Sequence, residues 1–279
     1  AELWRGGTAA VADICNTTDA LAAKKESNMH WHNLVEVINL RDEHLEGNIG
    51  KCQRVLQEHQ HNNLTAVLTP HAPYSISAKT FQHINAQTGG KVISIHNQES
   101  AAENELFQKG AGNFLQLYAA LGIEGSPFGV TGKTSLQTWL PYFKAGQTLL
   151  LVHNTFITEA DILFAKEHAA QHGLQIIYCL CPNANLYIED ALPPVDLLVK
   201  HNCHIVLGTD SYSSNWQLNI AAEMKVLHEQ LQIPLETLLQ WATTSGAAAL
   251  GQNQLGLFQK GAQPGVVLLQ DDFETKRII

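Results

Sequence analysis

His96 and Glu99 are the residues of this sequence best placed to do chemistry. An imidazole can bind a divalent metal ion, and a carboxylate beside that ion can carry a proton to or from a reacting group. Both follow the apolar run Lys91–Ile95, which predicts a short buried strand, and both precede a capping-box spacing, Ser100 to Glu103, typical of a helix start. The sequence therefore predicts a turn between a strand and a helix, where α/β proteins bind ligands.

Polar side chains also follow four further apolar runs. They are His71, His153, Asn183 with Asn185, and Asp210. If the runs are parallel strands of one barrel, their carboxyl ends form one face, and all of these groups surround one pocket. Each has an ordinary structural alternative: His71 could bond its own loop, His153 could be a core histidine, Asp210 could cap a helix, and the asparagines could form turns.

Other histidines are expected to lie away from this pocket. His30 and His32 precede a predicted strand, and His59 and His61 precede another, so both pairs belong at the opposite end of the sheet. We expect the second pair to be solvated and neither pair to bind metal.

Seven apolar, β-rich runs alternate with helical patterns and predict the strands that position these groups. The runs are Thr8–Ile14, Leu34–Leu40, Thr65–Leu68, Lys91–Ile95, Thr148–Val152, Gln175–Tyr178 and Ile205–Leu207. Near-continuous apolarity is typical of parallel strands that helices cover. Seven such units are one fewer than a (β/α)8 barrel requires. A doubly wound open sheet is the rival, but no Gly-x-Gly-x-x-Gly motif follows the first run.

Helix signals lie between these runs. The helix after Ser100 is expected to end at Gly110, and Thr158 with Asp161 has the spacing of a second capping box. The longest segment between strands, Phe107–Gln147, is expected to cover one end of the sheet and to help bind substrate.

Composition limits the class of protein. The 279 residues, 45% hydrophobic and 15% charged, indicate a globular protein without a disordered tract. A formal charge of -9 argues against a nucleic-acid partner, so we expect a small-molecule substrate; a homo-oligomer is left open. No segment approaches the roughly 20 apolar residues of a membrane span, and five scattered cysteines indicate a reducing, cytoplasmic setting. Cys179 and Cys181 should point to opposite faces of a strand, so no zinc site is predicted from them.

The two ends of the chain depart from the regular pattern. The sequence begins at Ala1 without an initiator methionine, in what reads as the middle of a helix-to-strand unit, so we expect it to be part of a longer gene product. Near the other end, a turn rich in glycine leads into a solitary strand, Val266–Leu269, which we expect to pair with a segment upstream.

Five motifs, in this order along the chain, resemble the amidohydrolase superfamily, particularly its branch of cytosine, guanine and adenosine-derivative deaminases and chlorohydrolases. The motifs are Pro70–Ser75, Ser94–Ser100, Leu151–Asn154, Cys181–Asn185 and Leu207–Ser211. The resemblance covers nearly the whole chain. It implies an α/β fold, a TIM-type (β/α)8 barrel, holding one divalent metal ion, zinc or iron.

The resemblance also implies roles for individual residues. His96 and Asp210 would be metal ligands, and Glu99 would be the proton shuttle. His153, together with Asp210, would hold the attacking hydroxide in place. The residues expected to face the substrate are His71, Asn183 and Asn185.

One departure from the family pattern affects these expectations. The family carries two ligands as His-x-His at the end of its first barrel strand, and no such segment precedes Thr8. We therefore expect residues 1–255 to form a barrel without its first strand, and residues 256–279 to be a remnant of the flanking β-sandwich. Because catalytic zinc usually takes three protein ligands, this chain is expected to hold metal weakly or not at all and to be inactive by itself.

For the intact protein, the expected activity is hydrolytic deamination of an aminated heterocycle, a nucleobase or an adenosine-like nucleoside, through a metal-activated water. Dechlorination or amide cleavage by the same residues is one alternative. A non-catalytic, metabolite-binding relic or an inactive fragment is another, although retention of the whole set of catalytic residues argues against a relic.

Overall fold

Seven parallel strands and a short hairpin form the β-structure of this protein. The computed structural model describes residues 2–263 and 265–279. Its strands are β1 (Ala10–Cys15), β2 (His30–Val37), β3 (Thr65–Pro70), β4 (Val92–Asn97), β5 (Thr148–His153), β6 (Gln175–Leu180), β7 (His204–Leu207), β8 (Val267–Leu269) and β9 (Thr275–Arg277). All seven predicted strands are present, although β2 begins at His30 and ends at Val37, earlier than the predicted Leu34–Leu40.

The seven strands follow chain order in two parallel sheets, β1-β2-β3 and β4-β5-β6-β7. The sheets meet between β3 and β4, where the Thr69 hydroxyl accepts a bond from Ser94 N–H at 2.7 Å and donates to the Ser94 carbonyl at 2.5 Å. The fold is α/β and of the TIM type, as predicted. Among the described residues no ladder joins β1 to β7, so the barrel is not closed.

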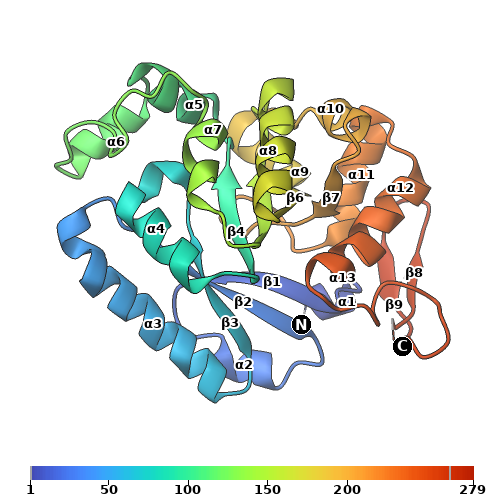
Figure 1. Cartoon of the computed structure of the whole chain (residues 1–279). Coiled ribbons are helices and arrows are strands. Elements are labelled where there is room, and N and C mark those ends of the chain that lie inside the picture. The colour runs from blue at the N-terminus through green and yellow to red at the C-terminus, as the bar shows by residue number, and fades with distance from the viewer. Residues whose placement is uncertain (1, 264) are drawn as a thin grey trace.

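Helices connect the strands and cover their outer surface (Figure 1). They are α1 (Glu2–Arg5), α2 (Leu21–Lys25), α3 (Leu45–His61), α4 (Ala78–Gln87), α5 (Ala101–Lys109), α6 (Phe114–Ala120), α7 (Ser135–Trp139), α8 (Glu159–His172), α9 (Pro182–Glu189), α10 (Val195–Lys200), α11 (Ile220–Leu231), α12 (Leu235–Gln240) and α13 (Gly246–Ala249). Shorter helical turns are η1 (Asp42–His44), η2 (Pro73–Ser75), η3 (Leu140–Tyr142) and η4 (Trp241–Ser245).

Two predicted helix starts have different outcomes. Thr158 and Asp161 form the predicted capping box at the start of α8. Helix α5 begins after Ser100 and ends at Gly110, which has a left-handed conformation, as predicted. The Ser100 side chain, however, makes no capping hydrogen bond. The Glu103 carboxylate instead accepts a hydrogen bond from Gln98 N–H at 3.0 Å, and this bond stabilises the turn that contains Glu99.

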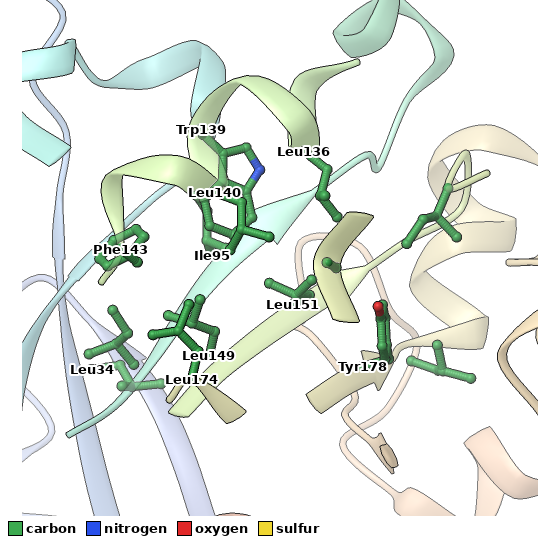
Figure 2. Packing of buried hydrophobic residues seen from close by; sticks show 14 of the residues in the cluster. Leu34, Ile95, Leu136, Trp139, Leu140, Phe143, Leu149, Leu151, Leu174 and Tyr178 are labelled. Carbon is green, nitrogen blue, oxygen red and sulfur yellow. The ribbon is translucent and has the colours of Figure 1, made fainter. Parts of the chain in front are cut away.

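Apolar packing on both faces holds the strands in place. On the outer face, Trp139, Leu140 and Phe143 pack with Ile95 and Leu149, and all five are 0–1% exposed (Figure 2). Burial of each such side chain contributes about 1.5–3 kcal/mol. Inside the barrel, a smaller cluster draws on several strands and on α13; its buried members are Leu150, Ile177, Val206 and Ala249, with Ala12 of β1 against them. The carboxyl ends of the strands therefore sit on a rigid support.

The last two strands form a hairpin of their own. Strand β8 pairs antiparallel with β9, so the expectation of an upstream partner is wrong: the second strand lies in the tail itself. The hairpin contacts the start of the chain through Arg277, which donates to the carbonyls of Trp4 and Thr8 at 2.8 and 3.0 Å. The Arg277 guanidinium also lies 3.6 Å from the centre of the Trp4 ring. None of the helices in the described residues is long and apolar enough to cross a membrane.

Candidate active site

Three predicted site residues meet beyond the carboxyl ends of β4, β5 and β7. One ligand atom from each of Glu99, His153 and Asp210 lies within 4.8 Å of the other two. His96, at the end of β4, stands beside this group, with its Nδ1 atom 3.1 Å from His153 Nε2. The structure therefore gathers the four residues for which chemistry was predicted.

Irregular backbone turns these side chains into the pocket. His153, Asn154 and Asp210 have φ angles of 74°, 63° and 57°, in the left-handed region that residues other than glycine seldom adopt. Such strain persists only where the surroundings fix it, and it is concentrated at functional sites. Here the buried Asn154 side chain helps to fix the turn by donating to the Leu151 carbonyl at 2.7 Å.

Burial sets the protonation of the two central groups. Burial lowers the pKa of His153 well below its ordinary value, and the neighbouring His96 lowers it further, so this imidazole is neutral near pH 7. Burial also raises the pKa of Glu99, although His96 opposes the shift. His153 Nε2 lies 3.3 Å from Glu99 Oε1. A neutral imidazole thus faces a carboxyl group that holds its proton more tightly than usual.

The predicted substrate-facing residues lie on two sides of this centre. Asn185 is fully buried in α9 and presents its Nδ2 atom to His153 Nδ1 at 3.5 Å. His71 follows β3, and its ring centre lies 5.1 Å from that of His96. Asn183 is the second residue of α9, and its backbone N–H donates to the Glu223 carboxylate at 2.9 Å. Contact of these three residues with a substrate stays a prediction.

Glu223 is a buried residue that the sequence did not single out. It joins Asn183 to Asn215, whose side chain also donates to the Thr209 carbonyl next to Asp210. Burial raises the pKa of Glu223 to about 7. This carboxylate therefore ties the start of α9 to the loop that carries Asp210.

Glu36 is a second residue that sequence reasoning missed. It lies near the end of β2, is 7% exposed, and places Oε1 3.4 Å from His96 Nε2. Burial opposes its ionisation, but His96 and His71 hold the pKa of Glu36 below its ordinary value. The predicted strand Leu34–Leu40 put this residue in mid-strand rather than at an end. A lone carboxylate within an apolar run was the signal that could have found it.

Two expectations about other residues are wrong. His59 is not solvated: it lies on the inner side of α3, fully buried, with Nδ1 2.9 Å from the Val55 carbonyl. Cys179 and Cys181 do not point to opposite faces, because residues two apart along a strand lie on the same face. Both sulfur atoms face Gly208, where an added Cβ would lie 2.8 and 3.1 Å from them.

Other expectations about histidines are met. His61 is exposed, as expected. His30 and His32 lie at the amino-terminal end of β2, and His32 Nε2 lies 2.9 Å from the Val92 carbonyl. Both are therefore away from the carboxyl ends of the strands, where the site lies.

The donor chemistry of the site fits a divalent metal ion. Imidazole nitrogens and carboxylate oxygens are the ligands that zinc and iron accept in proteins. Such donors are clustered in Glu99, His153 and Asp210, with His96 at their side.

Comparison with known proteins shows what this chain is similar to. The model of the amidohydrolase family matches residues 1–278. The chain is 24% identical over 283 residues to a 5-methylthioadenosine/S-adenosylhomocysteine deaminase of Thermococcus onnurineus (strain NA1), in a match that covers 96% of this chain. The chain spans 60% of the length of that deaminase.

Solved structures share the fold. An aminofutalosine deaminase of Helicobacter pylori in complex with methylthio-coformycin matches with a TM-score of 0.73 and 21% identity, over 99% of this chain and 64% of that one. An atrazine chlorohydrolase of Arthrobacter aurescens TC1 complexed with zinc matches with a TM-score of 0.65 and 15% identity, over 95% and 60% of the two chains.

Proposed function

The chain belongs to the amidohydrolase family, and on that premise we propose that it serves the hydrolytic deamination of an adenosine-like nucleoside. The substrate class is supported by the 24% identical relative, a deaminase of 5-methylthioadenosine and S-adenosylhomocysteine. The observation that carries the reaction type is the grouping of Glu99, His153 and Asp210 at the strand ends. These are the residue types that the removal of an amine by water requires.

The metal expected from the family would be held by His96 and Asp210, with His153 next to them. A divalent ion, zinc or iron, would supply Lewis acidity that lowers the pKa of a water molecule towards neutrality.

Proton transfer is the task of the chain's own residues. Glu99 would accept a proton from the attacking water and deliver it to a ring nitrogen of the substrate, and the raised pKa of Glu99 suits both steps. The neutral His153 would offer a lone pair to the water, and Asp210, within 4.8 Å of both His153 and Glu99, would help to hold it. Attack on the amine-bearing carbon gives a tetrahedral carbon that carries a hydroxyl and the amine. The hydroxyl proton then passes to the amine, and the C–N bond breaks to release ammonia as the C=O bond forms.

Substrate binding would fall to His71, Asn183 and Asn185 together with the segment 107–147. Within that segment, the Tyr118 hydroxyl donates to the Tyr74 carbonyl at 2.6 Å, and Trp139 Nε1 donates to Asn97 Oδ1 at 3.0 Å. These contacts place the segment beside the ends of β3 and β4. We propose that it covers the nucleoside once bound.

Release of ammonia is the measurement that tests this function. The intact protein, supplied with zinc or iron(II), is incubated with methylthioadenosine, adenosine, guanine and a chlorinated triazine. We expect ammonia from the adenosine compounds. Chloride from the triazine with no ammonia from any amine would favour the second candidate, dechlorination, which the shared fold of the chlorohydrolase makes worth testing. Release of neither product would contradict both.

Three further points complete the proposal. All five cysteines are free, which supports a reducing, cytoplasmic setting. The partner is a small molecule. Residues 1–255 would form the barrel unit, and residues 256–279 a separate small β-element.

A further inference from the structure

A second group of metal-ligand side chains lies on the far side of His96 from Glu99 and Asp210. It consists of Glu36, His71 and His96, which come from the ends of three successive strands, β2, β3 and β4. One ligand atom of each lies within 4.8 Å of the other two. Neither Glu36 nor His71 is a ligand in the site proposed above.

Glu36 is a buried carboxylate whose ion-pair partner in the described residues is a histidine, His96, at 3.4 Å. It is 7% exposed, and its Oε1 atom makes no hydrogen bond among the residues that the structure describes. Its Oε2 atom accepts one long bond, 3.3 Å, from Asn16. In the described part of the chain no lysine or arginine forms an ion pair with Glu36. A desolvated carboxylate of this kind requires a cation close to it.

Hydrogen bonding fixes the orientation of His71. The Ser75 hydroxyl donates to the Ala72 carbonyl at 2.9 Å, so its oxygen is the acceptor for His71 Nδ1–H at 2.7 Å. The proton therefore sits on Nδ1, and Nε2 is left with a free lone pair. A bond from the second ring nitrogen to a fixed acceptor is the usual way in which a protein orients a metal-binding histidine.

His96 can serve the group through its own Nε2 atom. That atom lies 3.4 Å from Glu36 Oε1, whereas Nδ1 faces His153. Two ligands bound at about 2.0–2.1 Å to a tetrahedral zinc ion lie roughly 3.3 Å apart. The observed separation therefore matches the edge of a zinc tetrahedron. Two imidazoles and one carboxylate, with a fourth position open, form one of the known zinc ligand sets.

From these observations we propose that Glu36, His71 and His96 bind a divalent first-row metal ion, at a position that does not use Glu99, His153 or Asp210 and shares only His96 with the metal ligands named above. A cation there neutralises the Glu36 carboxylate and gives the free lone pair of His71 a partner. The test of this site does not depend on the proposed function, because it measures metal binding and not turnover.

Cobalt(II) binding to the tag-free protein tests the site, with visible absorption and equilibrium dialysis as the two readouts. The Asp210→Asn variant removes a carboxylate from the other group, so any ion that remains reports on this one. We expect Asp210→Asn to bind about one equivalent of cobalt(II). Adding Glu36→Gln, or separately His71→Asn, should weaken that binding 10- to 100-fold or more.

A matched control is Asp210→Asn combined with Glu46→Gln, which changes an exposed glutamate on α3 and should bind cobalt(II) like the single variant. Circular dichroism confirms that each variant is folded. The proposal is overturned if Asp210→Asn binds no cobalt(II), or if the Glu36→Gln double variant binds as tightly as the control. Neither result bears on ammonia release by the wild-type protein, which is measured separately.

Discussion

At the scale of single residues, burial assigns different roles to side chains of ordinary chemistry. Glu99 precedes α5 and Glu103 lies in its first turn, and burial raises the pKa of both. Glu99 faces His153 in the pocket, whereas Glu103 is enclosed and accepts a bond from Gln98 N–H. The first is therefore placed to exchange a proton with a substrate, and the second to hold the turn.

Replacement of Glu99 by glutamine tests the proton shuttle. The amide keeps the shape of the side chain but cannot accept and return a proton, so we expect ammonia release to fall by about 10²- to 10⁴-fold. Steady-state ammonia release is the measurement. Glu236→Gln, on an exposed position of α12, serves as the control and should retain full activity. Undiminished turnover by Glu99→Gln would remove this residue from the mechanism.

Glu103 makes the stability of the protein depend on pH. Burial raises its pKa from an ordinary 4.5 to about 7, with the charge of Glu99 adding to the shift. Because the folded protein binds this proton more tightly than the unfolded chain, its contribution to the free energy of unfolding is full below about pH 4.5 and is lost as pH rises through 7.

The Glu103→Gln variant lacks this dependence. Its free energy of unfolding relative to wild type should rise between pH 5 and pH 8 by on the order of 3 kcal/mol, as measured by urea denaturation at each pH. A difference that does not change with pH would show that Glu103 is ionised throughout.

Much of the site could be predicted from single residues in the sequence, for an identifiable reason. His96 and His153 follow an apolar run directly, Asp210 follows one after Gly208 and Thr209, and parallel strands bring their carboxyl ends together. Glu36 could not be found in this way because its strand ends earlier than its apolar run suggests. The burial of His59 was also missed, since the spacing of histidines says nothing about which helix face they occupy.

At the scale of elements, one hydroxyl makes two of the hydrogen bonds between the two sheets. Apart from those of β2, strand boundaries were predictable because apolar runs end at polar residues. The division into three and four strands was not predictable, because no local pattern encodes it. The Thr69 hydroxyl bonds both the N–H and the carbonyl of Ser94 across this division. The next hydrogen bond between the two sheets is from His96 N–H to the His71 carbonyl, at 2.9 Å. The contact between the sheets therefore extends to two of the proposed metal ligands.

Thr69→Val should weaken the contact between β3 and β4. Valine has the same shape but leaves the Ser94 N–H and carbonyl without their partner in a buried setting, so we expect a loss of about 2 to 4 kcal/mol in the free energy of unfolding. Chemical denaturation measures the loss. Thr65→Val makes the same change at an exposed position of the same strand and should stay within about 0.5 kcal/mol of wild type. Equal effects of the two variants would contradict a special role for Thr69.

At the scale of the whole molecule, the alternation of strands and helices was enough to predict a barrel-like α/β fold. It was not enough to predict the terminal hairpin, whose second strand, Thr275–Arg277, is too short to stand out in the sequence. The curvature of the seven strands still brings Ala12 of β1 against the cluster formed by β5, β6 and β7. In the described residues, side-chain packing inside the barrel thus joins the edge strands β1 and β7, between which no backbone hydrogen bonds form a ladder.

The contact of Arg277 with Trp4 has a consequence for folding kinetics, since its partners are separated by 273 positions along the chain. A contact that closes so long a loop carries a large entropic cost and is expected to form after the transition state for folding. Arg277→Ala should therefore accelerate unfolding by about ten-fold and leave the folding rate nearly unchanged. Stopped-flow measurements in urea separate the two rates, with the exposed Lys276→Ala as the control. If folding itself slows, this pairing is an early event, and the two extremities of the chain meet before the barrel is complete.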